Sequence, residues 1–295
     1  MSDKFMQHLQ KSKVLIADGA TGTNLLSEGL PPGATPETWV IERPEKILDL
    51  ALSFVRAGSD IILTSTFGAT RLRLKDTSHA GEVVEINHRA VEIARQAAAQ
   101  GSGTLIAGSI GPTGQLLKPL GPLTPNDAVT VFEEQARALI EGGVDLIVIE
   151  TFFAIEEAQA ALDAVRKFSD LPVVISFSYD RGTRTMMGVR PSQVVKVFQP
   201  QGVAAIGGNC GTSLENMALV VKEYSETHPG LVIWVKPNAG LPLMNEDGTT
   251  SYNLTPDQMA RFCVNYVEAG ARIVGGCCGS TPAHIAAIAK ALKES

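Results

Sequence analysis

The chain has 295 residues and a formal net charge of −6, and 44% of its residues are hydrophobic and 19% charged. This composition is globular, and the length allows a sizeable core. The negative charge, without any basic stripe, argues against nucleic acid or an anionic membrane as a partner, because both favour clustered Lys and Arg. Residues 1–13 lack an apolar signal core, and no apolar run approaches the roughly 20 residues of a bilayer span. We therefore expect a cytoplasmic protein.

Short runs rich in Val, Ile and Leu alternate along the chain with helical patterns. The runs contain no regular alternation of polar residues, which is typical of strands buried on both faces of a parallel sheet. Several expected helices start with Thr followed by Pro, a capping residue and a favoured first helical residue. Eight units are expected, each a strand followed by a helix. Written as strand/helix, they are 14–17/44–57, 61–63/82–100, 105–107/from 124, 146–149/156–168, 173–177/191–198, 204–206/213–226, 231–235/255–269 and 272–274/from 281.

Eight strand–helix units predict a (β/α)₈ TIM barrel, in which residues 1–295 form a single domain with an N-terminal extension at 1–13. The alternative is an open, doubly wound sheet. Such a sheet usually has fewer units and a G-x-G-x-x-G fingerprint after its first strand, and segment 18–23 (DGATGT) lacks that spacing. No linker or low-complexity stretch divides the chain. The barrel is therefore favoured.

Polar residues and cysteines gather where the expected strands end. In a TIM barrel these carboxyl ends form the face that carries the active site. A rim of polar groups there usually serves a ligand, because burying such groups without partners is costly. Barrel closure also places the last strand beside the first and two strands away from the sixth. The strand-end residues are Asp18, Thr64, Ser65, Thr66, Ser109, Glu150, Thr151, Asn209, Cys210, Asn238, Cys277 and Cys278.

Three of the four cysteines belong to this set, and the barrel would bring Cys210, Cys277 and Cys278 together. Three thiolates with one open position suit catalytic Zn²⁺, whereas a structural zinc site usually has a fourth Cys or His. None of the five histidines lies at a strand end. Four cysteines are too few for a disulfide framework. Two other interpretations stay open. The strand-end thiols could be ordinary core residues, as we expect for Cys263, which lies in a predicted helix. The adjacent Cys277 and Cys278 could instead form a redox pair.

Two acids share the same face of the expected barrel, and their roles also have alternatives. Asp18 and Glu150 could act as a general acid and base. They could equally bind the ammonium group of an amino-acid substrate, which a thiol-binding zinc site makes more attractive. Charged residues on the outer helix faces are most simply solvated surface, and we assign them no role.

With these residues identified, the chain resembles the homocysteine S-methyltransferase family, and within it the homocysteine-binding barrel of cobalamin-dependent methionine synthase. The resemblance covers nearly the whole chain, and the two cysteine motifs together are highly specific. The motifs that carry it are DGATGT at 18–23, AGSIGPTG at 107–114, ET at 150–151, GNCG at 208–211, PNAGLP at 237–242 and GGCCG at 275–279.

The resemblance implies an enzyme, a zinc-dependent thiol methyltransferase. One Zn²⁺ per chain would be held by Cys210, Cys277 and Cys278, and the sulfur of homocysteine would complete the tetrahedron. A free alkyl thiol is mostly protonated at neutral pH, whereas zinc coordination deprotonates it. The zinc-bound thiolate would then attack a methyl group in line and give methionine.

The resemblance also implies how the substrate is held. Asp18 and Glu150 would bind the ammonium group of homocysteine, and backbone groups around Gly19 and Ser109 would bind its carboxylate. Asn238 would lie near the metal when substrate is absent. The full set of expected substrate-binding residues is Asp18, Gly19, Ser109, Glu150, Asn209 and Asn238.

The sequence departs from the family pattern at two positions. The family commonly has Thr-Asn-Thr-Phe after its second strand, whereas this chain has Ser65 as the second residue of that motif. An acid often follows the Glu-Thr motif by three residues, and Ala154 stands there instead. Neither change affects an expected metal ligand. Both lie where the thiol substrate is expected, so they bear on which thiol is the acceptor.

The methyl donor follows from the resemblance only as an expectation. Nothing in the sequence resembles a corrinoid-binding domain or a folate barrel, so the donor would be methylcobalamin carried by a separate corrinoid protein. Other members of the family take the methyl group from S-methylmethionine, S-adenosylmethionine or betaine, and these are the alternatives. From a different class, the chain could be a non-catalytic thiol- or zinc-binding subunit of a methyltransferase assembly. Asp18 and Glu150 favour an enzyme, because a zinc store needs no ammonium site.

Overall fold

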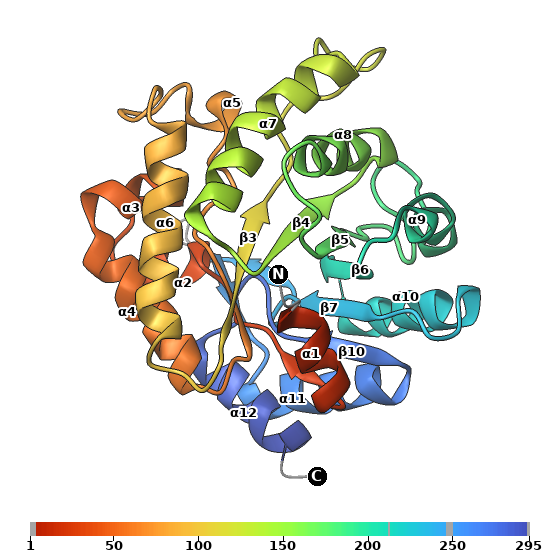
Figure 1. Cartoon of the computed structure of the whole chain (residues 1–295). Helices are drawn as coiled ribbons and strands as arrows, with labels where there is room; N and C mark the ends of the chain where they lie inside the picture. The colour runs from red at the N-terminus through yellow and green to blue at the C-terminus, as the bar shows by residue number, and fades with distance from the viewer. Residues whose placement is uncertain (1–3, 212, 246–249, 294–295) are drawn as a thin grey trace.

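Eight parallel strands form a barrel that is surrounded by helices (Figure 1). The computed structural model describes residues 4–211, 213–245 and 250–293. The strand order is β1-β10-β7-β6-β5-β4-β3-β2, and a parallel bridge between Ala17 and Ile61 joins the two ends of the sheet. The predicted (β/α)₈ fold is therefore confirmed. The barrel strands are β1 (Leu15–Ile16), β2 (Ile61–Leu63), β3 (Leu105–Ile110), β4 (Leu146–Phe152), β5 (Val173–Phe177), β6 (Ala205–Cys210), β7 (Ile233–Pro237) and β10 (Ala271–Val274).

The helices cover the outside of the barrel, and the expected Thr-Pro starts are present. Thr124 and Thr255 cap two helices by accepting hydrogen bonds from the backbone N–H groups of Asp127 and Gln258. Among the described residues, no helix combines the length and the apolarity needed to cross a membrane. The helices are α1 (Lys4–Lys11), α2 (Gly22–Ser27), α3 (Trp39–Glu42), α4 (Pro44–Arg56), α5 (Arg71–Leu74), α6 (Val83–Ala98), α7 (Pro125–Gly142), α8 (Ile155–Arg166), α9 (Pro191–Phe198), α10 (Leu214–Thr227), α11 (Pro256–Glu268) and α12 (Pro282–Lys293), with 3₁₀ turns η1 (Pro36–Thr38) and η2 (Gln199–Gln201).

The interior of the barrel changes from apolar to polar along its axis. One buried apolar cluster draws on all eight barrel strands and on α1, but on no helix of the outer ring. Because side chains alternate along a strand, inward-facing positions recur at every second residue. Toward the carboxyl ends of five strands, further positions of the same inward set are polar: Ser109, Glu150, Ser176, Asn209 and Lys236. We call these five residues the polar layer.

The N-terminal extension expected at 1–13 is in part a structural element. Residues 4–11 form helix α1, which lies across one end of the barrel (Figure 1) and shares an apolar cluster with residues near the amino ends of the strands. Phe5 and Leu9, one helical turn apart, are buried in the barrel cluster. The guanidinium of Arg272 donates hydrogen bonds to the carbonyls of Leu9 and Lys13, both at 2.7 Å. Residues 1–3 of the expected extension lie outside the described residues.

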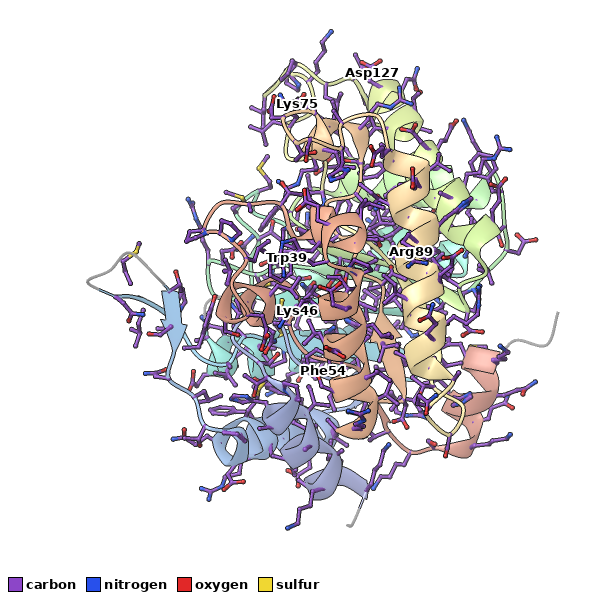
Figure 2. All side chains as sticks on the ribbon, turned by 90° about the vertical axis from the view of Figure 1, so that its left-hand side faces the viewer. Trp39, Lys46, Phe54, Lys75, Arg89 and Asp127 are labelled. Carbon is purple, nitrogen blue, oxygen red and sulfur yellow. The ribbon has the colours of Figure 1, made fainter. Side chains whose placement is uncertain are left out.

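Besides α5, which lies between β2 and α6 where no element was predicted, two further segments differ from the expectation. Between β1 and α4, where no element was predicted, the chain forms α2, η1 and α3. Between β7 and α11, where no strand was predicted, the chain forms an antiparallel hairpin of β8 (Pro242–Met244) and β9 (Thr250–Tyr252). This hairpin and α1 lie at opposite ends of the molecule (Figure 2). Both segments belong to the strand–helix connections, which carry function in this fold.

We predict that Phe5→Ala destabilises the protein by about 3–5 kcal/mol, because it opens a cavity at the closed end of the barrel. Gln10→Ala, on the exposed side of α1, is the matched control and should change stability by less than about 0.5 kcal/mol. Denaturant unfolding of both variants measures the difference. Equal stabilities would show that α1 is dispensable to the core.

Candidate active site

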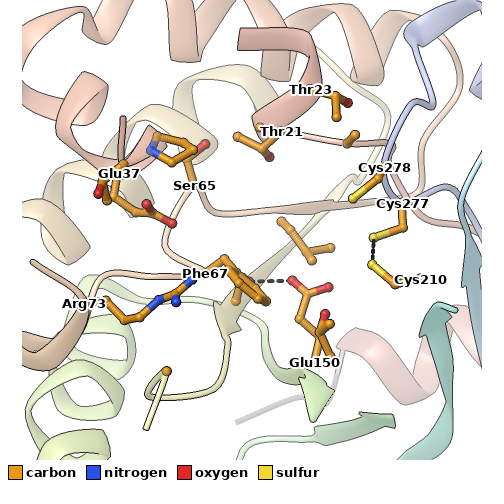
Figure 3. Close-up of a pocket in the computed structure, with 18 of the residues that line it drawn as sticks. Thr21, Thr23, Glu37, Ser65, Phe67, Arg73, Glu150, Cys210, Cys277 and Cys278 are labelled. Carbon is orange, nitrogen blue, oxygen red and sulfur yellow. Dashed lines mark hydrogen bonds between the residues drawn. The ribbon is translucent and has the colours of Figure 1, made fainter. Parts of the chain in front are cut away.

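The three strand-end cysteines converge at the carboxyl end of the barrel (Figure 3). The Sγ atoms of Cys210 and Cys277 are 2.7 Å apart, and all three Sγ atoms, with that of Cys278, lie within 4.8 Å of one another. Sulfur ligands of a tetrahedral zinc, each at about 2.3 Å from the metal, are about 3.8 Å apart. The separation of Cys210 and Cys277 is shorter than this, but all three thiols are close enough to one another to hold one metal ion. The prediction that the barrel brings these thiols together is confirmed.

The backbone is specialised so that the thiols can face one another. Cys210 has a φ of 56°, in the left-handed region that is costly for any residue but glycine. Gly207 permits β6 and β7 to approach, because a Cβ there would lie 1.7 Å from the carbonyl oxygen of Trp234. The Cys277 N–H donates to the carbonyl of Pro237 at 2.7 Å and so fixes the second cysteine against β7. The thiol cluster is thus held by main-chain geometry.

Ionisation of the thiols is coupled. Hydrogen bonds with Cys210 and Cys277 lower the pKa of the Cys278 thiol to about 3. Hydrogen bonds with Cys277 and Cys278 instead raise the pKa of Cys210. One thiolate therefore suppresses the ionisation of its neighbours. A bound dication would remove this restriction, because metal binding favours the deprotonated form of every ligand thiol.

Asn209 ties together the strand ends beneath the thiols. Its Oδ1 accepts hydrogen bonds from the Thr151 N–H at 2.9 Å and from the Ser176 hydroxyl at 2.6 Å. Its Nδ2 donates to the Thr151 Oγ1 at 2.6 Å and lies 3.9 Å from the Cys277 Sγ. Thr151 needs this support, since its φ is 65°. Asn209 is fully buried and lies outside the cavity lining, so its expected contact with substrate stays a prediction.

An ion pair that was not predicted lies inside the barrel. The Nζ of Lys236 donates to the Oδ1 of Asp18 at 2.6 Å, and the other oxygen of Asp18 accepts from the Leu63 N–H at 2.7 Å. Burial opposes a charge on Lys236, but Asp18 and Glu150 outweigh it and raise its pKa, so the ammonium stays charged. Lys236 lines the cavity beside the thiols and Asp18 does not. The sequence signal for this ion pair was Lys236 itself, a single charged residue at the end of the apolar run 231–236.

Of the two acids expected to bind the substrate, Glu150 lines the cavity and Asp18 does not. The Oε1 of Glu150 accepts a hydrogen bond from the Ser109 hydroxyl at 2.6 Å. Burial raises the pKa of Glu150 to about 7, although the nearby Lys236 lowers it. Ser109 and Gly19 also line the cavity. The Ser109 N–H already donates a hydrogen bond to the Thr64 Oγ1 at 3.0 Å.

The cavity has a volume of about 750 Å³ and extends well beyond the thiols. Glu37 and Arg73 lie at the end away from the cysteines, and Arg73 is placed over the Phe67 ring (Figure 3). This volume lies in the range of about 300–1,000 Å³ that is typical of small-molecule sites. Of the two departures from the family pattern, Ser65 lines the cavity and Ala154 does not.

Comparisons with known proteins agree with this geometry. The profile of the homocysteine S-methyltransferase family matches residues 15–292. The chain therefore belongs to the homocysteine S-methyltransferase family, and its barrel is the fold on which the site is built.

Individual relatives point the same way. The methionine synthases of Mycobacterium tuberculosis and Mycobacterium leprae are 30% and 29% identical to the chain over 95% of its length. The chain spans about a quarter of the length of these relatives. The homocysteine methyltransferase MmuM of Escherichia coli, in its oxidized and metallated forms, is 26% and 25% identical. Both forms align with a TM-score of 0.82 over 97% of this chain and 98% of the other.

We predict that Cys210→Ala, Cys277→Ala and Cys278→Ala each abolish stoichiometric zinc binding and leave the barrel folded, because the thiols lie at its rim. Cys263→Ala is the matched control, since that thiol is buried in α11 away from the cavity. Elemental analysis of the purified proteins, with circular dichroism for the fold, tests this. A full complement of zinc in all three variants would show that these cysteines are not the metal ligands.

Proposed function

We propose that the protein transfers a methyl group to the thiol of homocysteine and yields methionine, with a zinc ion held by Cys210, Cys277 and Cys278. The observation that carries this proposal is the convergence of the three thiols at one end of a cavity beside Glu150. Zinc bound there would keep the acceptor thiol deprotonated and nucleophilic at neutral pH.

Glu150 is our choice for the main contact of the substrate ammonium group. It lines the cavity near the thiols, and its hydrogen bond from Ser109 orients the carboxylate. Asp18 can contribute charge from below, but both of its oxygens already have partners. A charge-assisted hydrogen bond to a buried carboxylate is strong enough to position an amino acid.

The remaining substrate contacts extend this proposal. Gly19 presents its backbone to the cavity, since a Cβ there would lie 2.6 Å from the Phe54 ring; this supports its role toward the substrate carboxylate. Asn238 lies between Pro237 and Ala239, which pair through their backbones with the two adjacent cysteines. Its Oδ1 is buried and has no hydrogen-bond partner among the described residues. An oxygen of this kind supports a position near the metal when substrate is absent.

The chemistry required of the chain is positioning. As the sulfur–carbon bond forms, the bond between the methyl group and its donor breaks, and the electron pair of that bond leaves with the donor. The thiol proton has been released before this step. Holding the thiol and the methyl group in one cavity turns a bimolecular encounter into a reaction between aligned groups. Asn209 contributes indirectly, because it fixes the strand ends that carry the thiols.

For the donor we propose a methylated corrinoid carried by a separate protein. Exposed apolar side chains on the loops after β3, β5 and β7 support a protein partner at this end of the barrel. These are Leu116, Leu120, Met186, Met187, Leu241 and Leu243. Exposed apolar side chains on several connections at one end of the barrel support an interaction surface there.

The direct test combines zinc-loaded protein with homocysteine and methylcobalamin. We expect loss of the methyl–cobalt absorption and formation of methionine, followed by mass spectrometry. Homocysteine binding without turnover would contradict the corrinoid donor and direct the test to S-methylmethionine, S-adenosylmethionine and betaine. No methionine with any of these donors would contradict a catalytic role and favour a non-catalytic thiol-binding subunit.

We predict that Glu150→Gln weakens homocysteine binding about tenfold or more and leaves zinc content unchanged, because a neutral amide lacks the charge that an ammonium group requires. Glu156→Gln, on the exposed face of α8, is the matched control. Calorimetry of the zinc-loaded proteins measures both. Unchanged affinity in the Glu150 variant would place the ammonium site elsewhere.

The same variant has a pH signature. With a pKa of about 7, Glu150 is protonated on the acid side and cannot pair with an ammonium group. The wild-type affinity divided by the variant affinity should therefore rise with pH up to about 7 and level off above it. The ratio cancels the ionisation of the thiol itself, which is common to both proteins. A ratio that does not change with pH would contradict this assignment.

A further inference from the structure

The chain places an ammonium group of its own next to the two acids expected to bind the substrate ammonium. The Nζ of Lys236 lies 2.6 Å from the Oδ1 of Asp18, and the two side chains are only 4% and 5% exposed. Lys236 also reaches the wall of the cavity that holds the thiols and Glu150. Asp18 has both oxygens engaged, by Lys236 and by the Leu63 N–H.

This arrangement changes the charge that a substrate meets. Asp18 and Lys236 neutralise each other, so Glu150 is the one member of the acid pair left facing the cavity. Glu150 itself is already compensated, by the hydrogen bond from Ser109 and by the nearby positive charge of Lys236. A substrate ammonium group can therefore form one ion pair here, whereas it could form two if both carboxylates were unpaired.

The consequence concerns thiols that lack an amino group. A site rejects an analogue strongly when the analogue leaves buried polar or charged groups unpaired. Here the loss of the substrate amine leaves Asp18 fully paired and Glu150 partly compensated. The penalty for a missing amine is therefore small.

We propose that Lys236 determines acceptor specificity: its ammonium occupies part of the acid-pair site, and the enzyme accordingly accepts thiol carboxylates without an α-amino group as well as homocysteine. The inference rests on the proposed function, since it concerns the acceptor of the same thiol site. Lys236 acts here as a specificity residue and takes no part in the transfer of the methyl group.

The test compares homocysteine with 4-mercaptobutyrate, which is homocysteine without its amino group. Calorimetry of the zinc-loaded wild type should give affinities for the two thiols within about tenfold of each other. Lys236→Met frees both carboxylates for an external cation, so its preference for homocysteine should increase by about tenfold or more. Lys293→Met is the matched control, because Lys293 pairs with Asp60 at 2.7 Å away from the cavity; its preference should equal that of the wild type.

A charge-balanced double variant guards against loss of the fold. Lys236→Met combined with Asp18→Asn removes both members of the ion pair and leaves no unpaired buried charge between them. Only Glu150 then remains to bind an ammonium group, so the preference should return close to that of the wild type. A specificity that follows the number of free carboxylates in this way would not arise from a merely structural lysine.

Two results would overturn the inference alone, with homocysteine binding intact. One is a wild-type preference for homocysteine above about a hundredfold, and the other is an unchanged preference in Lys236→Met. If neither thiol binds the zinc-loaded wild type, the proposed function fails, and the inference fails with it.

Discussion

The strict alternation of side chains along the strands of a closed barrel decides where each functional group of this protein lies. Inward positions recur at every second residue, so the barrel fills with apolar side chains from α1 upward and then ends in a polar layer. Glu150 and Lys236 face the same interior because each stands two residues beyond a buried apolar position on its own strand. The thiol cluster and the cavity lie directly above this layer.

A polar layer at this depth is stable because its members form hydrogen bonds and ion pairs with one another and with the strand ends beside them. Lys236 pairs with Asp18, Ser109 donates to Glu150, and Asn209 joins neighbouring strand ends. Removing one partner would leave a buried charge or a buried polar atom unpaired, which is far more costly than the pair itself is stabilising. The same network supports the left-handed backbone at Thr151, next to Glu150. The groups that hold the barrel together are thus also those that position the side chains of the site. A binding site needs such support to keep its residues in a fixed geometry.

The sequence allowed the fold and the thiol cluster to be predicted, but it did not show how the polar groups pair. Cys210 and Cys277 were located because each follows a β-branched run and a pair of glycines, a local signal. Lys236 was overlooked because its partner, Asp18, is 218 positions away in the chain, and only strand register brings the two together. The burial of α1 had a visible signal, Phe5 and Leu9 one helical turn apart, but the polar residues around them obscured it.

The central claim is that the three thiols hold a metal which takes the substrate thiol as its fourth ligand. X-ray absorption at the zinc edge of the loaded protein, recorded without and with homocysteine, tests this claim most directly. We predict three sulfur ligands at about 2.3 Å in the free protein and four after homocysteine is added. An unchanged sulfur count on addition of a saturating thiol would contradict the account, because the acceptor would then react without touching the metal.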